Sequence, residues 1–254
     1  MLRLETHAGI ARLLLDRPAR RNACTQAMWD EFPRLVDRAM ADPAVRLLIV
    51  GSAAPGMFCA GADIAEFASA AGDAEWRARN QAAIRATQVT LARAPKPTLA
   101  AIAGDCIGGG CGIALACDLR IAVPGARFGI TPARLGLVYP LHDTRLLVDL
   151  VGPGQAKRLL YSAMLIDAGE ALRIGLVEQV SDDLDATVAA YAEALLAAAP
   201  STQRATKAIV ARILAGATDD DAASAAGFDA AFTGADFAEG VAAFLAKRAP
   251  RFGA

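Results

Sequence analysis

Two glycine-bearing turns are the part of this sequence best suited to chemistry. One covers residues 59–63 (CAGAD) and the other residues 108–112 (GGGCG), and each leads into a predicted helix. Glycine permits unusual backbone dihedrals and close approach of a ligand, and a helix start adds unpaired N–H donors. If the two turns face each other, two N–H groups can bind one oxygen as an oxyanion hole, which stabilises a carbonyl that becomes an enolate. The alternative is that the glycines only allow close helix–strand packing.

Several familiar enzyme motifs are absent from both turns. Neither turn contains GxGxxG, GxxxxGK or GxSxG, which argues against a dinucleotide-binding protein, a P-loop protein or a serine hydrolase. The five cysteines are odd in number and lack CxxC spacing, and the chain has only two histidines, so we expect no metal site. Reduced, buried thiols are typical of a cytoplasmic protein, and the N-terminus shows no apolar signal segment. We therefore expect a cytoplasmic location.

The composition argues against three further classes of protein. Hydrophobic residues make up 55% and charged residues 21% of the 254 residues, which does not fit a disordered chain. Lys and Arg number 26 against 27 Asp and Glu, so the basic surplus of a nucleic-acid-binding protein is missing. The mean hydropathy is +0.34. The least charged stretch, residues 106–117, is nevertheless rich in glycine and well short of the roughly 20 residues of a membrane-spanning helix.

The elements that must position the two turns alternate in type along the first half of the chain. Residues 2–6 and 10–15 predict a hairpin, and the apolar runs at 46–51, 98–103 and 118–123 predict buried strands. Helices are predicted at 25–40, 63–70, 74–94 and 111–116, and this alternation favours a parallel α/β core. After Pro140 the pattern is helical. We expect a core domain over residues 1–195 and a helical C-terminal region over residues 196–254.

Five short motifs carry a resemblance that extends over nearly the whole chain, from about Leu13 to Phe252. They are RPARRNA (17–23), FCAGADI (58–64), PKP (95–97), GGGC with ACDLR (108–111 and 116–120) and AGEALRIGLV (168–177). In this order and spacing they resemble the enoyl-CoA hydratase/isomerase, or crotonase, family. The resemblance implies a crotonase (ClpP-like) fold, a spiral of ββα units whose C-terminal helices serve trimerisation, as a homotrimer or a dimer of trimers. It also implies acyl-CoA thioester substrates, with coenzyme A as part of the substrate and no separate cofactor.

The resemblance also implies the roles of particular residues. The family's two oxyanion-hole amides fall on Ala62 and Gly109, in agreement with the interpretation of the two turns. The positions that resemble the family's coenzyme A contacts are Arg20, Arg21, Ala23, Ala60, Asp63, Ile64, Gly110, Phe244 and Lys247. The last two match a pair that in relatives reaches coenzyme A in a neighbouring subunit. For the arginines, Arg17 among them, a solvated charged face is the alternative, and Asp63 also suits a helix cap.

The chain departs from the family at both positions that carry the hydratase glutamates. Gly112 and Pro132 occupy them, and neither residue can transfer a proton, so the usual water addition and isomerisation lose their catalytic groups. The segment TPARLGLVY (131–139) instead resembles the methylmalonyl-CoA decarboxylase branch, although that branch often has His at the position of Ala62. Decarboxylation of a malonyl-type thioester needs an electron sink and a later proton donor, but no base. Tyr139 can donate the proton, and Thr131 can hydrogen-bond the departing carboxylate.

Two alternatives stay open at this point. The first is a divergent hydratase, isomerase or lyase that uses Tyr139, His142 or Asp143 together with water. The second is a non-catalytic homologue that only binds acyl-CoA. The sequence carries no signature of a particular acyl group.

Overall fold

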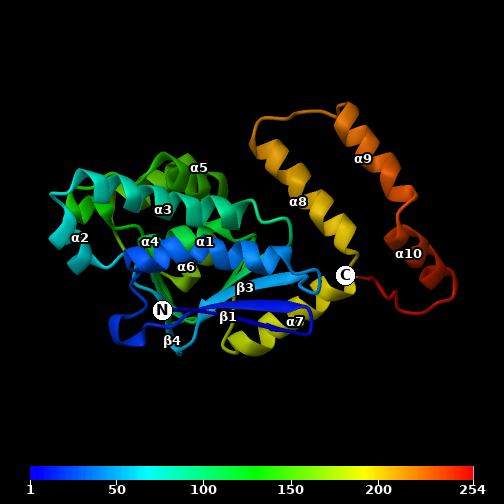
Figure 1. Ribbon diagram of the computed structural model, residues 1–254, viewed down its shortest axis with the longest axis horizontal. Helices are drawn as coiled ribbons and strands as arrows, with labels where there is room; N and C mark the ends of the chain where they lie inside the picture. Colours follow the sequence, from blue (N-terminus) through cyan, green and yellow to red (C-terminus); the bar gives the residue numbers. More distant parts are fainter. Residues whose placement is uncertain (254) are drawn as a thin grey trace.

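A six-stranded sheet forms one layer of the protein, in a computed structural model that describes residues 1–253 (Figure 1). Its strands, in spatial order, are β1 (Leu2–His7), β2 (Ile10–Leu15), β3 (Leu47–Ser52), β5 (Thr98–Ile102), β7 (Leu119–Ala122) and β10 (Gln179–Val180). The first two strands form an antiparallel hairpin, and every other neighbouring pair is parallel. The predicted hairpin, the three strands predicted from apolar runs and the parallel α/β core are therefore confirmed.

A second, smaller sheet carries the two glycine-bearing turns. Its strands, in spatial order, are β4 (Gly56–Cys59), β6 (Gly104–Ile107), β8 (Arg127–Gly129) and β9 (Ile166–Asp167). Strands β4, β6 and β8 are parallel, and β9 is antiparallel to β8. The sequence analysis does not predict these strands, because each is only two to four residues long and most begin or end at a glycine.

The chain repeats a strand–strand–helix unit, and each unit crosses from one sheet to the other. In the first unit β3 and β4 lead to α2 (Ile64–Ala70) and α3 (Ala74–Ala92). In the second, β5 and β6 lead to α4 (Gly109–Ala116), and in the third β7 and β8 lead to η2 (Pro132–Leu135) and α5 (Leu141–Ser162). The first strand of every unit lies in the larger sheet and the second lies in the smaller sheet. The ends of β4 and β6 therefore lie side by side.

The larger sheet is buried on both faces, as the apolar run of β3 predicts. Leu48 and Val50 point into the main core, which also contains apolar residues of α1 (Gln26–Ala41). Leu47 and Ile49 point to the opposite face, where they pack with Val188 and other residues of α7 (Leu184–Ala197). A continuous apolar strand is the pattern expected for a parallel sheet covered on both sides.

Polar side chains and glycine fix the ends of several helices. The Thr25 hydroxyl accepts a hydrogen bond from Met28 N at the start of α1, and the Asp63 carboxylate accepts one from Ala65 N at the start of α2. Gly152, with φ +73°, interrupts α5, so this helix consists of two helical parts that meet at a bend. These caps confirm the predicted helix starts at Thr25 and Asp63.

The last helices stand apart from the two sheets. After α6 (Ala168–Arg173) and α7, the helices α8 (Pro200–Leu214), α9 (Ala222–Phe232) and α10 (Ala235–Leu245) project from one end of the molecule, opposite α2 (Figure 1). No residue of α9 is buried. Among residues 1–253, no helix combines the length and the apolar character needed to cross a bilayer. The division at residue 195 stays a prediction; it falls near the end of α7.

Candidate active site

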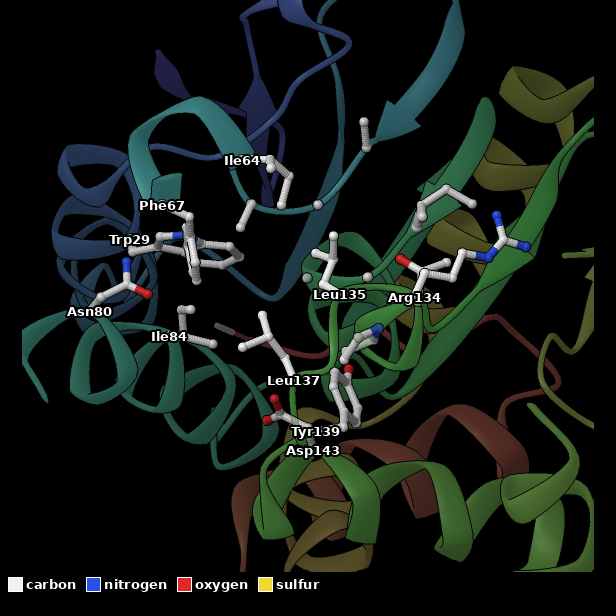
Figure 2. Close-up of a pocket in the computed structure, with 18 of the residues that line it drawn as sticks. Trp29, Ile64, Phe67, Asn80, Ile84, Arg134, Leu135, Leu137, Tyr139 and Asp143 are labelled. Carbon is white, nitrogen blue, oxygen red and sulfur yellow. The ribbon is translucent and has the colours of Figure 1, made fainter. Parts of the chain in front are cut away.

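A cleft of about 700 Å³ opens between α2 and α3 on one side and the segment from η2 to the start of α5 on the other. Figure 2 shows the side chains that line it, with Trp29, Phe67 and Asn80 on one wall and Arg134 and Leu135 on the other. Both glycine-bearing turns contribute to the lining, through residues 60–62 and 107–109. Among the residues singled out as catalytic from the sequence, Ala62, Gly109, Thr131 and Tyr139 all line this one cleft.

The two turns meet inside the cleft. A Cβ atom placed on Gly61 would lie 3.3 Å from the Gly109 nitrogen, and one placed on Gly109 would lie 3.6 Å from the Ala62 nitrogen. Within residues 1–253, no backbone or side-chain acceptor takes a hydrogen bond from either nitrogen. The Gly109 amide is also the first of α4, where the helix has no internal acceptor to offer it. The two N–H groups are therefore close together and available to one oxygen atom.

The backbone of both turns requires glycine. Gly61 has φ +98°, and Gly108 has φ +55° with ψ −116°. A side chain is strained in these conformations, and a Cβ atom on Gly61 would also lie 3.0 Å from the carbonyl oxygen of Ile107. The glycines thus do more than allow helix–strand packing, because they let the two turns touch.

Thr131 lies beside the turn that carries the Gly109 amide, and its hydroxyl does not cap the helix that follows. It is the residue before η2, and its side chain makes no capping hydrogen bond there. A Cβ atom placed on Gly108 would lie 4.0 Å from Thr131 Oγ1. The hydroxyl can therefore contact a group attached next to a carbonyl bound at the two amides.

The closed end of the cleft holds Tyr139 and Asp143, which Figure 2 shows at the same end of the pocket. The Tyr139 hydroxyl is buried and has no hydrogen-bonding partner among residues 1–253. Burial raises its pKa well above the usual value, and the nearby Asp143 carboxylate adds to the effect. Asp143 is 2% exposed, and burial raises its pKa to about 6. His142 is half-buried and lies outside the lining; burial lowers its pKa, and so do nearby arginines.

Gly112 and Pro132, which stand where hydratases of this kind carry their two glutamates, lie near the Tyr139 hydroxyl and the two turns. Gly112 sits one turn along α4 from Gly109, and Pro132 is the first residue of η2. A Cβ atom at Gly112 would overlap the Gln88 amide nitrogen and lie 3.2 Å from the Tyr139 hydroxyl, so a side chain there would require the Gln88 amide to move. Tyr139 and Gln88 thus fill the space that a side chain on α4 would otherwise take.

Comparisons with known proteins agree with this architecture. The protein-family model described as enoyl-CoA hydratase/isomerase matches residues 5–254. A crotonyl-CoA hydratase of Syntrophomonas wolfei is 38% identical, over 98% of this chain and 96% of its own length. This chain belongs to the enoyl-CoA hydratase/isomerase family. A methylglutaconyl-CoA hydratase of Mus musculus is 32% identical, over 98% of this chain and 81% of its own length.

Solved structures of this family superpose on nearly the whole chain. An enoyl-CoA hydratase/isomerase family protein of Hyphomonas neptunium has a TM-score of 0.95 at 38% identity and covers 99% of this chain and 97% of its own. The AtuE protein of Pseudomonas aeruginosa has a TM-score of 0.90 at 35% identity, with 98% of both chains covered. The predicted crotonase fold is confirmed, and the chain is an enzyme of a family that acts on CoA thioesters.

The positions predicted to bind coenzyme A in this family member divide into two groups. Arg21, Ala60 and Ile64 line the cleft. The others do not, namely Arg20, Ala23, Asp63, Gly110, Phe244 and Lys247. Phe244 is 83% exposed on α10, at the end of the molecule opposite α2 (Figure 1). Contact of Phe244 and Lys247 with coenzyme A in a neighbouring subunit stays a prediction.

Internal contacts account for several residues outside the lining. The Arg17 guanidinium lies 2.7 Å from the Asp63 carboxylate and lowers the pKa of that carboxyl, and it also donates to the Ala23 carbonyl oxygen. A Cβ atom on Gly110 would lie 2.5 Å from the Cys59 carbonyl oxygen, so this glycine serves close packing. Asp63 acts as the cap of α2, the alternative considered for it from the sequence.

Four residues at the cleft were not predicted from the sequence as part of the site. They are three aromatic residues that line it, Trp29, Phe67 and Trp76, and the buried Gln88. Trp29 is fully buried in α1 and packs against Gly109, while Phe67 and Trp76 form an edge-to-face pair with ring centroids 5.2 Å apart. Trp29, Trp76 and Gln88 lie far from the two turns in sequence, and Phe67 follows the first turn closely but belongs to no motif. The five cysteines are buried and unbridged, as predicted.

Proposed function

We propose that this enzyme decarboxylates a malonyl- or methylmalonyl-type CoA thioester. The thioester oxygen accepts hydrogen bonds from the Ala62 and Gly109 amides. When the bond between the α-carbon and the carboxylate breaks, CO₂ leaves and the electron pair passes into the thioester as an enolate, whose negative oxygen the two amides stabilise. Transfer of one proton to the α-carbon then gives the saturated acyl-CoA.

Two side chains assist in this proposal. Thr131 donates its free hydroxyl to the carboxylate that leaves, since that hydroxyl lies next to the Gly108 turn. Tyr139 supplies the proton. Its pKa is raised, so the hydroxyl stays protonated at neutral pH, and among residues 1–253 no protein group accepts its hydrogen in place of the substrate.

One observation carries the proposal: two unpaired amides converge in a cleft where Gly112 and Pro132 offer no side chain that moves protons. An enolate can be stabilised there, but the usual pair of carboxylates cannot activate water. Loss of CO₂ generates the enolate without a base, so the site contains what this reaction needs.

The test is CO₂ release from methylmalonyl-CoA by the purified enzyme and by Tyr139→Phe. We expect release by the wild type and a fall of roughly a hundredfold in kcat for Tyr139→Phe, the contribution typical of a general acid. Tyr161→Phe is the matched control, since Tyr161 is 77% exposed at the end of α5. No release by the wild type, or equal rates for the two variants, contradicts the proposal.

Asp143 favours a second candidate, hydration of an enoyl-CoA. A carboxyl with a pKa of about 6 that lines the cleft suits a general base near neutral pH. The relative from Syntrophomonas wolfei is named a crotonyl-CoA hydratase. This candidate predicts loss of crotonyl-CoA absorbance, at a rate that rises with pH through about 6 as Asp143 ionises, and loss of that activity in Asp143→Asn. Tight coenzyme A binding without turnover of either thioester would instead indicate a non-catalytic homologue.

We further propose that the enzyme assembles as a homotrimer or a dimer of trimers. Phe244 and Lys247 would then approach coenzyme A bound to the neighbouring subunit. The exposed apolar residues of α9 and α10 support the proposal, since patches of this kind mark interaction surfaces.

A further inference from the structure

Gln88 is a buried amide that none of the steps above uses. It lies on α3 and is fully buried, and within residues 1–253 neither its side-chain nitrogen nor its side-chain oxygen has a hydrogen-bonding partner. Leaving a buried polar group unpaired is a cost to the stability of the folded protein. An apolar side chain of the same length would avoid this cost, so the amide calls for a functional explanation.

The Gln88 amide faces the same point as the Tyr139 hydroxyl. That point is the position of a Cβ atom on Gly112: the Gln88 amide nitrogen overlaps it, and the Tyr139 hydroxyl oxygen lies 3.2 Å from it. Both groups are buried, and neither has a hydrogen-bonding partner in the part of the chain that the structure describes. Glycine at position 112 thus makes room for an amide that comes from another helix.

The Gln88 amide also acts on Asp143. Burial raises the pKa of Asp143, and the Gln88 side chain lowers it in part because it lies within reach of the carboxyl, although no formed hydrogen bond joins the two groups within residues 1–253. A neutral amide can donate through its nitrogen and accept through its oxygen at the same time. It can therefore hold a hydroxyl and a carboxyl in a fixed relation without itself gaining or losing a proton.

We propose that Gln88 is a positioning residue that orients the Tyr139 hydroxyl toward the reacting carbon and connects it to Asp143. This inference rests on the proposed role of Tyr139 as proton donor. The Gln88 amide occupies the space in which a side chain of α4 would lie, and this space is open because residue 112 is a glycine. Gln88 itself does not touch the substrate, because it lies behind the surface of the cleft.

The first test observes the Tyr139 hydroxyl without any turnover. The protein is labelled with tyrosine carrying ¹³C at the ring carbon that bears the hydroxyl, and Tyr139→Phe assigns the Tyr139 signal among the three tyrosines. Gln88→Met keeps the length of the side chain but removes the amide, and Gln155→Met is the matched control on α5. We expect the Tyr139 signal to shift in Gln88→Met only. An unmoved signal in folded Gln88→Met overturns the proposal, and Gln88→Glu serves for the same comparison if Gln88→Met does not fold.

The second test is a double-mutant cycle on CO₂ release from methylmalonyl-CoA. We expect Gln88→Met to lower kcat about tenfold with little change in KM, the effect of losing one oriented hydrogen bond. In the Tyr139→Phe background the same substitution should cost almost nothing, because the group that it orients is gone. An equal loss in both backgrounds indicates a general structural role and overturns the proposal. If the wild type releases no CO₂, the proposed function fails, and the labelled-tyrosine experiment still decides whether Gln88 holds Tyr139.

Discussion

At the scale of single residues, the proposed mechanism gives charge stabilisation to main-chain atoms and proton transfer to side chains. The direction of the Ala62 and Gly109 amides depends on the shape of the backbone, and position 109 also has to stay small, because a Cβ atom there would lie 3.0 Å from the Trp29 ring. Tyr139 and Gln88 come from two other segments and meet beside Gly112, and Gln88 also lies close to Asp143. The sequence predicted Tyr139 at the site and offered Asp143 as an alternative, but it did not indicate Gln88, because Gln88 lies on α3 and no motif links it to the other two residues.

The raised pKa of Asp143 has a consequence for stability. The pKa of its carboxyl is about 6 in the native state and near the ordinary value of 3.8 when unfolded, so the native state binds more protons between these pH values. The free energy of unfolding therefore falls as pH rises through this range and stays lower above it. Asp143→Asn mimics the protonated form and should increase the free energy of unfolding above pH 6 by at most about 3 kcal/mol.

Urea unfolding of the wild type and Asp143→Asn at several pH values measures this difference. We expect the two proteins to converge near pH 4 and to separate as the pH rises toward 7. Asp149→Asn, an exposed aspartate on the same helix, is the control and should show no such trend. A variant that is destabilised at pH 7 would show that the native state needs the charged carboxylate.

At the scale of elements, the site depends on the strands that precede each turn. The sequence predicts β3, β5 and β7 well because apolar runs of this kind are typical of buried parallel strands. It does not predict β4 and β6, whose four residues give no periodicity to detect. The turns were recognisable only through their glycines, and the pairing of β4 with β6 explains why the turns meet.

Gly108→Ala tests the turn before α4. A side chain is strained at φ +55° and ψ −116°, so the backbone should relax and turn the Gly109 amide away. We expect kcat on the enzyme's thioester substrate to fall about 10²–10³-fold, as for loss of one oxyanion-hole donor. Gly125→Ala is the control, since nothing lies within 4 Å of a Cβ atom there. Comparable rates for the two variants would mean that the Gly109 amide does not act in catalysis.

At the scale of the whole molecule, the C-terminal helices expose more apolar surface than a free surface normally carries. The exposed large apolar side chains on α8, α9 and α10 are Ile209, Val210, Ile213, Leu214, Phe228, Phe232, Phe237, Val241, Phe244 and Leu245. The sequence predicted a helical C-terminal region, but it did not predict that so many of the apolar side chains there would be exposed.

Phe232→Asp tests this surface. A charge in the middle of the Phe228–Phe232–Phe237 cluster should prevent assembly, because a buried unpaired carboxylate is costly. Light scattering should give a multiple of three chains for the wild type and a single chain for the variant. Asp229→Ala changes the same helix without adding charge and should leave the mass unaltered. A monomeric wild type would contradict the assembly proposal.

The neighbouring strands β4 and β6 set the distance between the two donors of the oxyanion hole. Adjacent strands in any sheet lie about 4.8 Å apart, a repeat dictated by peptide hydrogen bonding and not by the identity of side chains. In the proposed mechanism, substitutions elsewhere in the cleft therefore change which acyl group fits or how protons move, while the spacing of the two amides stays the same. Gly112 and Pro132 stand at the positions of the two glutamates that this chain lacks, and neither of them alters the pairing of β4 with β6.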